Sequence, residues 1–153
     1  MTDNTSFTAV YDSFLSKITD DMYMELFPDE TNSLLQTLML SALHWFEFPK
    51  VDIFDYNLNE EMFNIALSNE EINIIATYMV AEWVGQQLAS VENTRMKYSG
   101  SDFKFTSQAN HIGKLLALKE DYLNRGLHLQ RLYKRRKKVN GVISSSFDQI
   151  MEV

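Results

Sequence analysis

Cysteine is absent from this sequence of 153 residues, which also contains only five glycines and two prolines. The absence of cysteine excludes disulfide bonds, thiolate metal sites and cysteine nucleophiles, and it agrees with assembly in a reducing cytoplasm. The scarcity of glycine and proline favours helices over disordered linkers. The longest apolar runs are far shorter than the roughly 20 residues that a membrane-spanning helix needs. We therefore expect a soluble, helix-rich protein with no membrane partner.

The length predicts one domain, which we place at residues 1–138. Residues 1–5 lack the basic and apolar regions of a signal peptide. Residues 139–153 have a different composition, with one glycine, three consecutive serines and a final apolar group of Phe147, Ile150 and Met151. This composition predicts an extended C-terminal tail that docks on a partner through its apolar end.

Charge is distributed unevenly along the chain. Residues 1–90 contain 15 acidic and 2 basic side chains, whereas residues 91–153 contain 6 acidic and 12 basic ones. The net charges of these parts are therefore −13 and +6, which together give the −7 of the whole chain. Such opposite charges either attract each other within one monomer or bring the acidic part of one copy against the basic part of the next, as a ring or filament requires.

The stretch from Ser68 to Lys138 is predicted to form two long helices joined by a short polar turn, on which the other segments pack. Ser68 and Glu71 have the spacing of a capping box, which predicts a helix start. Apolar residues then recur every three or four positions, as on one face of a helix. In the first helix they are Ile72, Ile75, Ala76, Met79, Val80, Trp83, Val84, Leu88 and Val91. In the second, which is predicted to begin near Thr106 or Ser107, they are Ile112, Leu115, Leu116, Leu118, Tyr122, Leu123, Leu127 and Leu132.

Two shorter helices are predicted before this hairpin, at residues 5–18 with Thr5 or Ser6 as the cap, and from Asp29 to about Trp45. Residues 47–61 alternate apolar with acidic residues, which predicts an extended segment that packs on the helices or on another subunit. Residues 62–67 are predicted to form a short strand. The fold class is therefore mainly α: a helical bundle built on a long helical hairpin, with a possible minor two-stranded element.

The turn predicted at residues 97–106 combines aromatic with basic side chains. Its aromatic residues are Tyr98, Phe103 and Phe105, and they stand among Arg95, Lys97 and Lys104. Such a tip is suited to stacking on nucleic-acid bases, to anchoring a protein interface, or to packing on its own molecule. The sequence leaves these alternatives open.

No pattern indicates an enzyme, a cofactor or a metal. The three histidines, His44, His111 and His128, do not have the spacing of metal ligands on one helix face. Nucleophile-elbow, phosphate-loop and dinucleotide motifs are all missing from the sequence. Adjacent glutamates occur at predicted helix starts, where they commonly act as caps. We therefore expect a protein without catalytic residues.

The strongest local signal is a run of six cations within eight positions near the end of the second long helix. Its members are Arg131, Lys134, Arg135, Arg136, Lys137 and Lys138. These cations either complement the helix dipole, contact DNA phosphates without sequence specificity, or meet the acidic surface of a neighbouring subunit.

Two stretches resemble small virion proteins of tailed bacteriophages that infect Gram-positive bacteria. They are residues 92–104 (ENTRMKYSGSDFK) with 106–111 (TSQANH), and residues 5–15 (TSFTAVYDSFL). The resemblance extends from residue 5 to about residue 138, and it points to head-to-tail connectors, the adaptors of the neck. It contributes no catalytic motif.

The resemblance implies a virion neck protein that is assembled in the host cytoplasm. As partners it implies other copies in a ring of about twelve, the portal protein, and tail or stopper proteins, with genomic DNA passing non-specifically through the ring. Two alternatives remain: a structural protein of the tail or baseplate, and a phage-encoded helical protein that binds nucleic acid.

Overall fold

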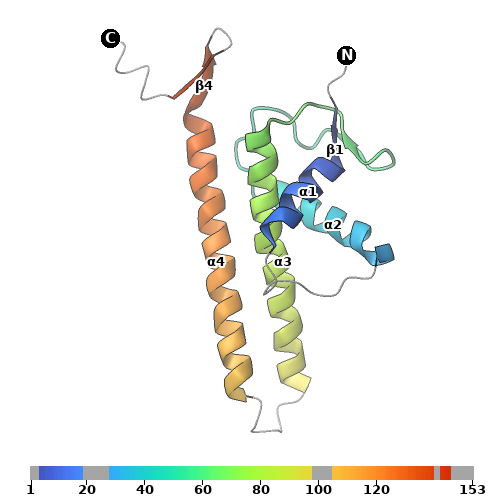
Figure 1. Cartoon of the computed structure of the whole chain (residues 1–153), viewed down its shortest axis with the longest axis vertical. Coiled ribbons are helices and arrows are strands. Elements are labelled where there is room, and N and C mark those ends of the chain that lie inside the picture. The colour runs from blue at the N-terminus through green and yellow to red at the C-terminus, as the bar shows by residue number, and fades with distance from the viewer. Residues whose placement is uncertain (1–3, 19–27, 98–104, 140–141, 146–153) are drawn as a thin grey trace.

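The computed structural model describes residues 4–18, 28–97, 105–139 and 142–145, and it describes side chains for residues 4–18, 31–90 and 110–136. The described residues form four helices, α1 (Phe7–Lys17), α2 (Pro28–Leu43), α3 (Asn69–Lys97) and α4 (Phe105–Arg135). The strands are β1 (Thr5–Ser6), β2 (Tyr56–Asn57), β3 (Met62–Phe63), β4 (Arg136–Val139) and β5 (Val142–Ser145). The prediction of a mainly helical fold is confirmed (Figure 1). Within these ranges, none of the helices has the length and apolarity needed to span a membrane.

The long helices α3 and α4 lie side by side, as predicted (Figure 1). The capping box at the start of α3 is present. The Glu71 amide donates to Ser68 Oγ at 3.2 Å, and the Ser68 amide donates to Glu71 Oε1 at 2.8 Å. Two amides that would otherwise have no partner at the helix start are therefore satisfied. Ser6 caps α1 in a similar way, because its Oγ accepts the Thr8 amide at 3.3 Å.

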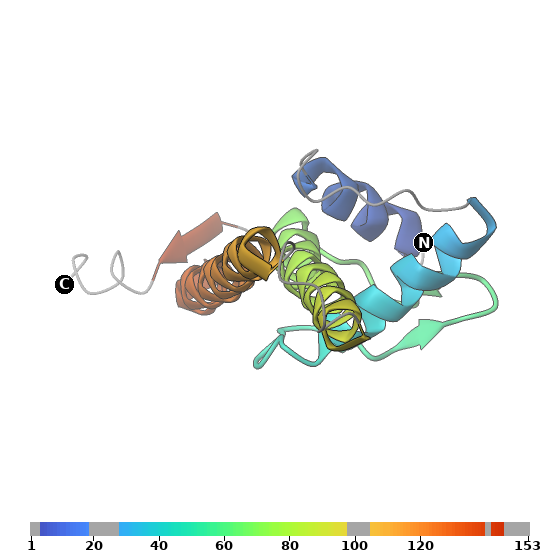
Figure 2. The ribbon, with the colours of Figure 1, turned by 90° about the horizontal axis from the view of Figure 1, so that it is seen from below.

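Helix α3 is the centre of the fold, with α4 on one side and α1 and α2 on the other (Figures 1 and 2). We predicted one apolar stripe on this helix, and that prediction was too narrow. Residues 74–81 are all buried, including Thr77 and Tyr78. A helix that is covered on several sides is apolar around most of its circumference, so a single stripe does not describe it.

Helix α4 has one covered face and one open face. Ile112, Leu115 and Tyr122 are buried against α3, as predicted. Leu116 and Leu127 were predicted to lie on the same apolar face, but they are 49% and 40% exposed. The correction has a geometric reason: among the described residues α4 packs chiefly on α3, so only part of its circumference is covered.

A small antiparallel sheet of order β1-β3-β2 joins the N-terminus to the segment before α3. Thr5 pairs with Phe63, and Tyr56 pairs with the same residue from the other side. The predicted strand at 62–67 is shorter than expected, and its pairing with β1 was not predicted. Strands of two residues are too short for a period-two pattern to reveal them.

The segment 47–61 divides into buried and exposed apolar residues. Ile53 is fully buried and holds the segment on the helices, whereas Phe48 and Phe54 are 64% and 48% exposed. Packing on the helices is therefore confirmed for Ile53 and not for the two phenylalanines, for which packing on another subunit stays a prediction.

The basic run is divided between two elements. Helix α4 ends at Arg135, and Arg136 to Lys138 belong to β4, which pairs with β5 in a hairpin. The prediction that the whole run lies at a helix C-terminus is corrected, because the chain changes to extended structure within the run. The predicted boundary between residues 138 and 139 falls inside β4, and residues 146–153 lie outside the described residues.

Candidate interaction surfaces

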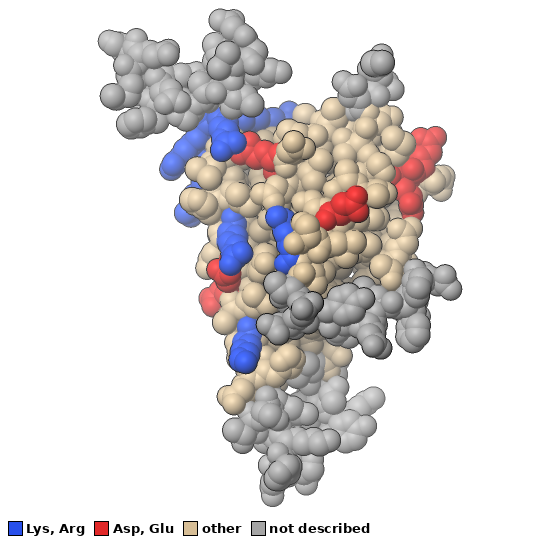
Figure 3. Space-filling view, in the orientation of Figure 1, with Lys and Arg blue, Asp and Glu red and all other residues tan. Residues whose placement is uncertain are grey.

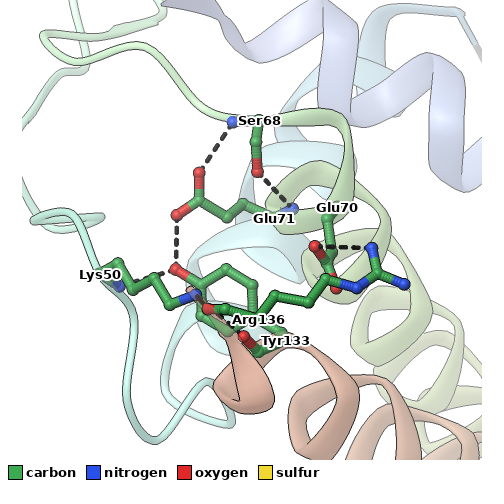
Figure 4. Close-up of polar contacts among 6 residues, drawn as sticks. All are labelled: Lys50, Ser68, Glu70, Glu71, Tyr133 and Arg136. Atoms are coloured by element: carbon green, nitrogen blue, oxygen red, sulfur yellow. Dashed lines mark hydrogen bonds and ion pairs between the residues drawn. The ribbon is translucent and has the colours of Figure 1, made fainter. Parts of the chain in front are cut away.

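A polar cluster around Tyr133 joins the end of α4 to the start of α3 (Figure 4). The buried Tyr133 hydroxyl donates to Glu71 Oε2 at 2.8 Å and accepts the Lys50 amide at 2.7 Å. Because the other oxygen of Glu71 accepts the Ser68 amide, this one carboxylate both caps α3 and holds α4. Glu71 is 4% exposed, so its charge is compensated by hydrogen bonds instead of by water.

Lys50 closes the other side of this cluster. Its Nζ donates to the carbonyl oxygen of Tyr133 at 2.9 Å and to that of Arg136, which satisfies carbonyls at the end of α4. The Arg136 guanidinium lies 3.2 Å from Glu70 Oε2. The first residue of β4 is thus tied to the first turn of α3.

Burial strongly raises the pKa of the Tyr133 hydroxyl, and this exceeds the opposing effect of the hydrogen bond from the Lys50 amide. The carboxylates of Glu71 and Glu70 raise this pKa further. Tyr133 therefore remains a neutral donor at physiological pH. The cluster joins the two helices, because its hydrogen bonds connect Tyr133 of α4 with Glu71 of α3 and with Lys50.

A second joint holds the middle of α4 against α3. Gln130 Nε2 donates to the Tyr78 hydroxyl at 2.6 Å and to the Trp45 carbonyl oxygen at 2.9 Å. The Tyr78 ring stacks on Trp45 with centroids 5.8 Å apart, and atoms of the same ring lie next to Gly126. A Cβ at Gly126 would lie 2.7 and 2.8 Å from two carbons of the Tyr78 ring, so only glycine permits this approach of the helices.

Basic side chains are concentrated on α4, whereas most of the described acidic side chains lie on other elements. Residues 110–136 contain seven basic and two acidic side chains, whereas the side chains described before residue 91 include nine acidic and two basic ones. In Figure 3, Lys and Arg gather over α4, and the largest group of Asp and Glu lies at the opposite edge. The separation that the sequence indicated along the chain is thus also a separation in space.

Near the end of α4, a shallow groove of about 310 Å³ lies between this helix and residues 46–48. The exposed side chains of Phe48 and Leu127 line it together with Arg131 and Lys134. Lys134 Nζ lies 4.8 Å from the centroid of the Phe48 ring, a cation–π contact. The lining therefore combines apolar side chains with two cations and one carboxylate, that of Glu47, and the apolar and cationic residues together suit an apolar side chain that is flanked by carboxylates.

A larger pocket of about 610 Å³ lies between the end of α1, α3 and the other side of α4. Its charged lining residues are Lys17, Arg125 and Asp121, and the last two form an ion pair at 2.7 Å. Burial, and secondarily the charge of Arg125, lowers the pKa of Lys17. This pocket is more polar than the groove.

Comparison of the chain with models of protein families, with curated proteins and with solved structures finds no match. The surfaces described above are therefore interpreted from their own chemistry. In the part of the chain that the structure describes, no group of three His, Asp or Glu side chains is arranged to hold a metal ion.

The structure brings together only part of the predicted site. Arg131, Lys134 and Arg135 are exposed at the end of α4, and Arg136 pairs with Glu70. Lys137 and Lys138 are in β4, but their side chains lie outside the described residues, as does that of Phe105 at the start of α4. The remaining predicted docking residues also lie outside the described residues: Tyr98, Phe103, Phe147, Ile150 and Met151.

Sequence reasoning missed Phe48 as part of the basic groove and Lys50 as a partner of Tyr133. Both lie more than 80 residues before their partners on α4. One signal was available: Lys50 is one of only two basic residues in the acidic stretch 1–90. An isolated cation in such a stretch is a reasonable candidate for a specific contact.

Proposed function

We propose that this protein is a structural virion protein, a head-to-tail connector that forms a ring between portal and tail around the DNA channel. The proposal combines the phage-like stretches at residues 5–15 and 92–111 with the arrangement of charge. The observation that carries it is the separation of a basic α4 side from an acidic opposite side, with α3 between them. A subunit with complementary opposite sides is suited to the head-to-tail contacts of a closed ring.

The open face of α4 adds support to this proposal. Leu116 and Leu127 are exposed there on the same helix as several basic side chains, and a protein interface could cover them. In the proposed ring, the basic end at Arg131 to Lys138 faces either a neighbouring subunit or the passing DNA. The C-terminal segment 139–153 contacts the portal or a neighbouring copy.

Two measurements test this proposal. Electron microscopy of the purified chain at low salt is expected to show closed rings, and gold-labelled antibodies are expected to mark the junction of head and tail on intact particles. Label at the tail tip would favour the tail or baseplate alternative. A protein that remains monomeric and is absent from particles would overturn both structural roles.

The exposed cations Arg131 and Lys134 motivate a second candidate, a helical protein that binds nucleic acid. This role predicts tight binding to duplex DNA that weakens steeply as salt is added, because counterions are released from the phosphates. Rings with only weak DNA binding would favour the connector.

A further inference from the structure

We infer that the tip of the β2–β3 hairpin, residues 58–61, docks in the basic groove at the end of α4 of a second copy of this chain. The inference rests on the proposed ring and names the contact that closes it. The partner is another copy because the acidic tip and the basic groove complement each other and occupy different sides of one molecule.

The tip presents an apolar side chain beside carboxylates. Leu58 is 47% exposed, and Glu60 is exposed next to it. Glu61 completes the tip, and its Oε1 accepts a hydrogen bond from Asn32 Nδ2 at 2.8 Å. This is the combination that the groove is suited to receive: the leucine against Phe48 and Leu127, and the carboxylates near Arg131 and Lys134.

The tip is held in one conformation before it meets a partner. Asn57 Oδ1 accepts the amides of Asn59 at 2.9 Å and Glu60 at 3.3 Å, which fixes the turn. Asn57 pairs with Met62 across the hairpin, and Glu61 has a left-handed φ of 52°. A preformed tip loses little conformational entropy on docking, so a small contact suffices for binding.

The groove and the tip of one molecule are too far apart to meet each other. Figures 1 and 2 both place α4 on one side of α3 and the green β2–β3 segment on the other. The contact is therefore heterologous, with the tip of each copy in the groove of the next. Repetition of such a contact gives a ring if the rotation closes and a filament if it does not.

The larger pocket beside Lys17 is a weaker receptor for the same tip. Its cation Arg125 already pairs with Asp121, so a carboxylate is present where the tip would bring another. Like charges at an interface oppose association. The groove at Phe48 also has one carboxylate among its lining residues, Glu47, but in the described residues no ion pair joins it to Arg131 or Lys134.

Charge reversal in the full-length chain tests this inference. Lys134→Glu and Glu60→Lys are each expected to weaken assembly about tenfold or more, measured by light scattering over a dilution series. The double variant, Lys134→Glu with Glu60→Lys, is expected to restore assembly because the pair is then reversed. Lys114→Glu, which changes an exposed cation of α4 outside the groove, is the matched control and is expected to assemble like the wild type.

Unfolding curves first establish that every variant is folded, so that a loss of assembly reports on the contact between copies and not on folding. Loss in both single variants with rescue in the double variant supports the contact. Wild-type rings that survive both reversals overturn the contact but leave the connector proposal standing. Loss in Arg125→Glu alone would place the tip in the larger pocket and also overturn the inference. If the wild type never assembles and is absent from the neck, the connector proposal itself fails.

Discussion

Helices α3 and α4 have similar lengths, 29 and 31 residues, but the protein uses them differently. Most of the first half of α3 is buried, and α1, α2 and α4 pack around it. In contrast, α4 buries one face and leaves leucines and cations on the other. The comparison teaches that α3 contributes chiefly to stability, whereas the open face of α4 is available for binding.

The largest expected difference in stability between the two helices is seen when one apolar side chain of each is shortened to alanine. Ile75→Ala on α3 is expected to lower the free energy of unfolding by about 4 kcal/mol, because the side chain is fully buried and leaves a cavity. Leu116→Ala on α4 is expected to lower it by about 0.5 kcal/mol or less. Urea unfolding at one low protein concentration measures both. Equal losses would contradict the division of roles.

Replacement of two glycines of α4 by alanine tests the stability of its covered face, at Gly126, against that of its open face, at Gly113. Gly126→Ala is expected to cost about 3 kcal/mol, because the new methyl group overlaps the Tyr78 ring, which is buried and stacks on Trp45. Gly113→Ala is expected to stabilise the protein by about 0.8 kcal/mol, since no atom lies within 4 Å of the added carbon and alanine favours helix. Thermal unfolding distinguishes them, and the same sign in both variants would be inconsistent with this packing.

The joint between the two helices is tested at Tyr133. Tyr133→Phe is expected to cost about 2 kcal/mol, because Glu71 Oε2 loses its donor and the Lys50 amide loses its acceptor in a buried site. Tyr122→Phe on the same helix is the control, with an expected change within about 0.5 kcal/mol. If the two variants have the same free energy of unfolding in urea, the hydrogen bonds of the Tyr133 hydroxyl contribute no more to stability than the Tyr122 hydroxyl does.

A smaller effect than at Tyr133 is expected at Tyr11 of α1. In the described residues, its hydroxyl is the buried side-chain polar atom that has no hydrogen-bond partner, so Tyr11→Phe is expected to stabilise the protein by about 1 kcal/mol. Burial, with a contribution from the charge of Glu61, raises the pKa of Tyr11 from 10.0 to about 12.

This raised pKa makes the contribution of Tyr11 dependent on pH. The unfolded chain releases the proton near pH 10, but the folded protein retains it. The free energy of unfolding is therefore unaffected by this group below pH 10 and falls as the pH rises from 10 to about 12. Urea unfolding at pH 8, 10 and 11 is expected to show that the free energy of unfolding falls less with rising pH in Tyr11→Phe than in the wild type. Parallel falls would contradict the raised pKa.

Local sequence signals were sufficient to predict the helices and their caps. Ser68 and Glu71 predicted the start of α3, because a capping box depends only on residues three positions apart. The three-strand sheet and the β4–β5 hairpin were harder to predict. Their strands are two to four residues long, and β1 pairs with a strand more than 50 residues away.

By itself, the sequence determined the helical class, the hairpin of α3 and α4, and the opposite charges of the two parts of the chain, because these depend on composition and short-range periodicity. Only the tertiary structure decided which apolar residues of α4 remain exposed, and it brought Phe48 and Lys50 to the basic end of that helix. It also gave Glu71 a second role as the acceptor of Tyr133. These features depend on contacts between distant segments, which short-range patterns do not encode.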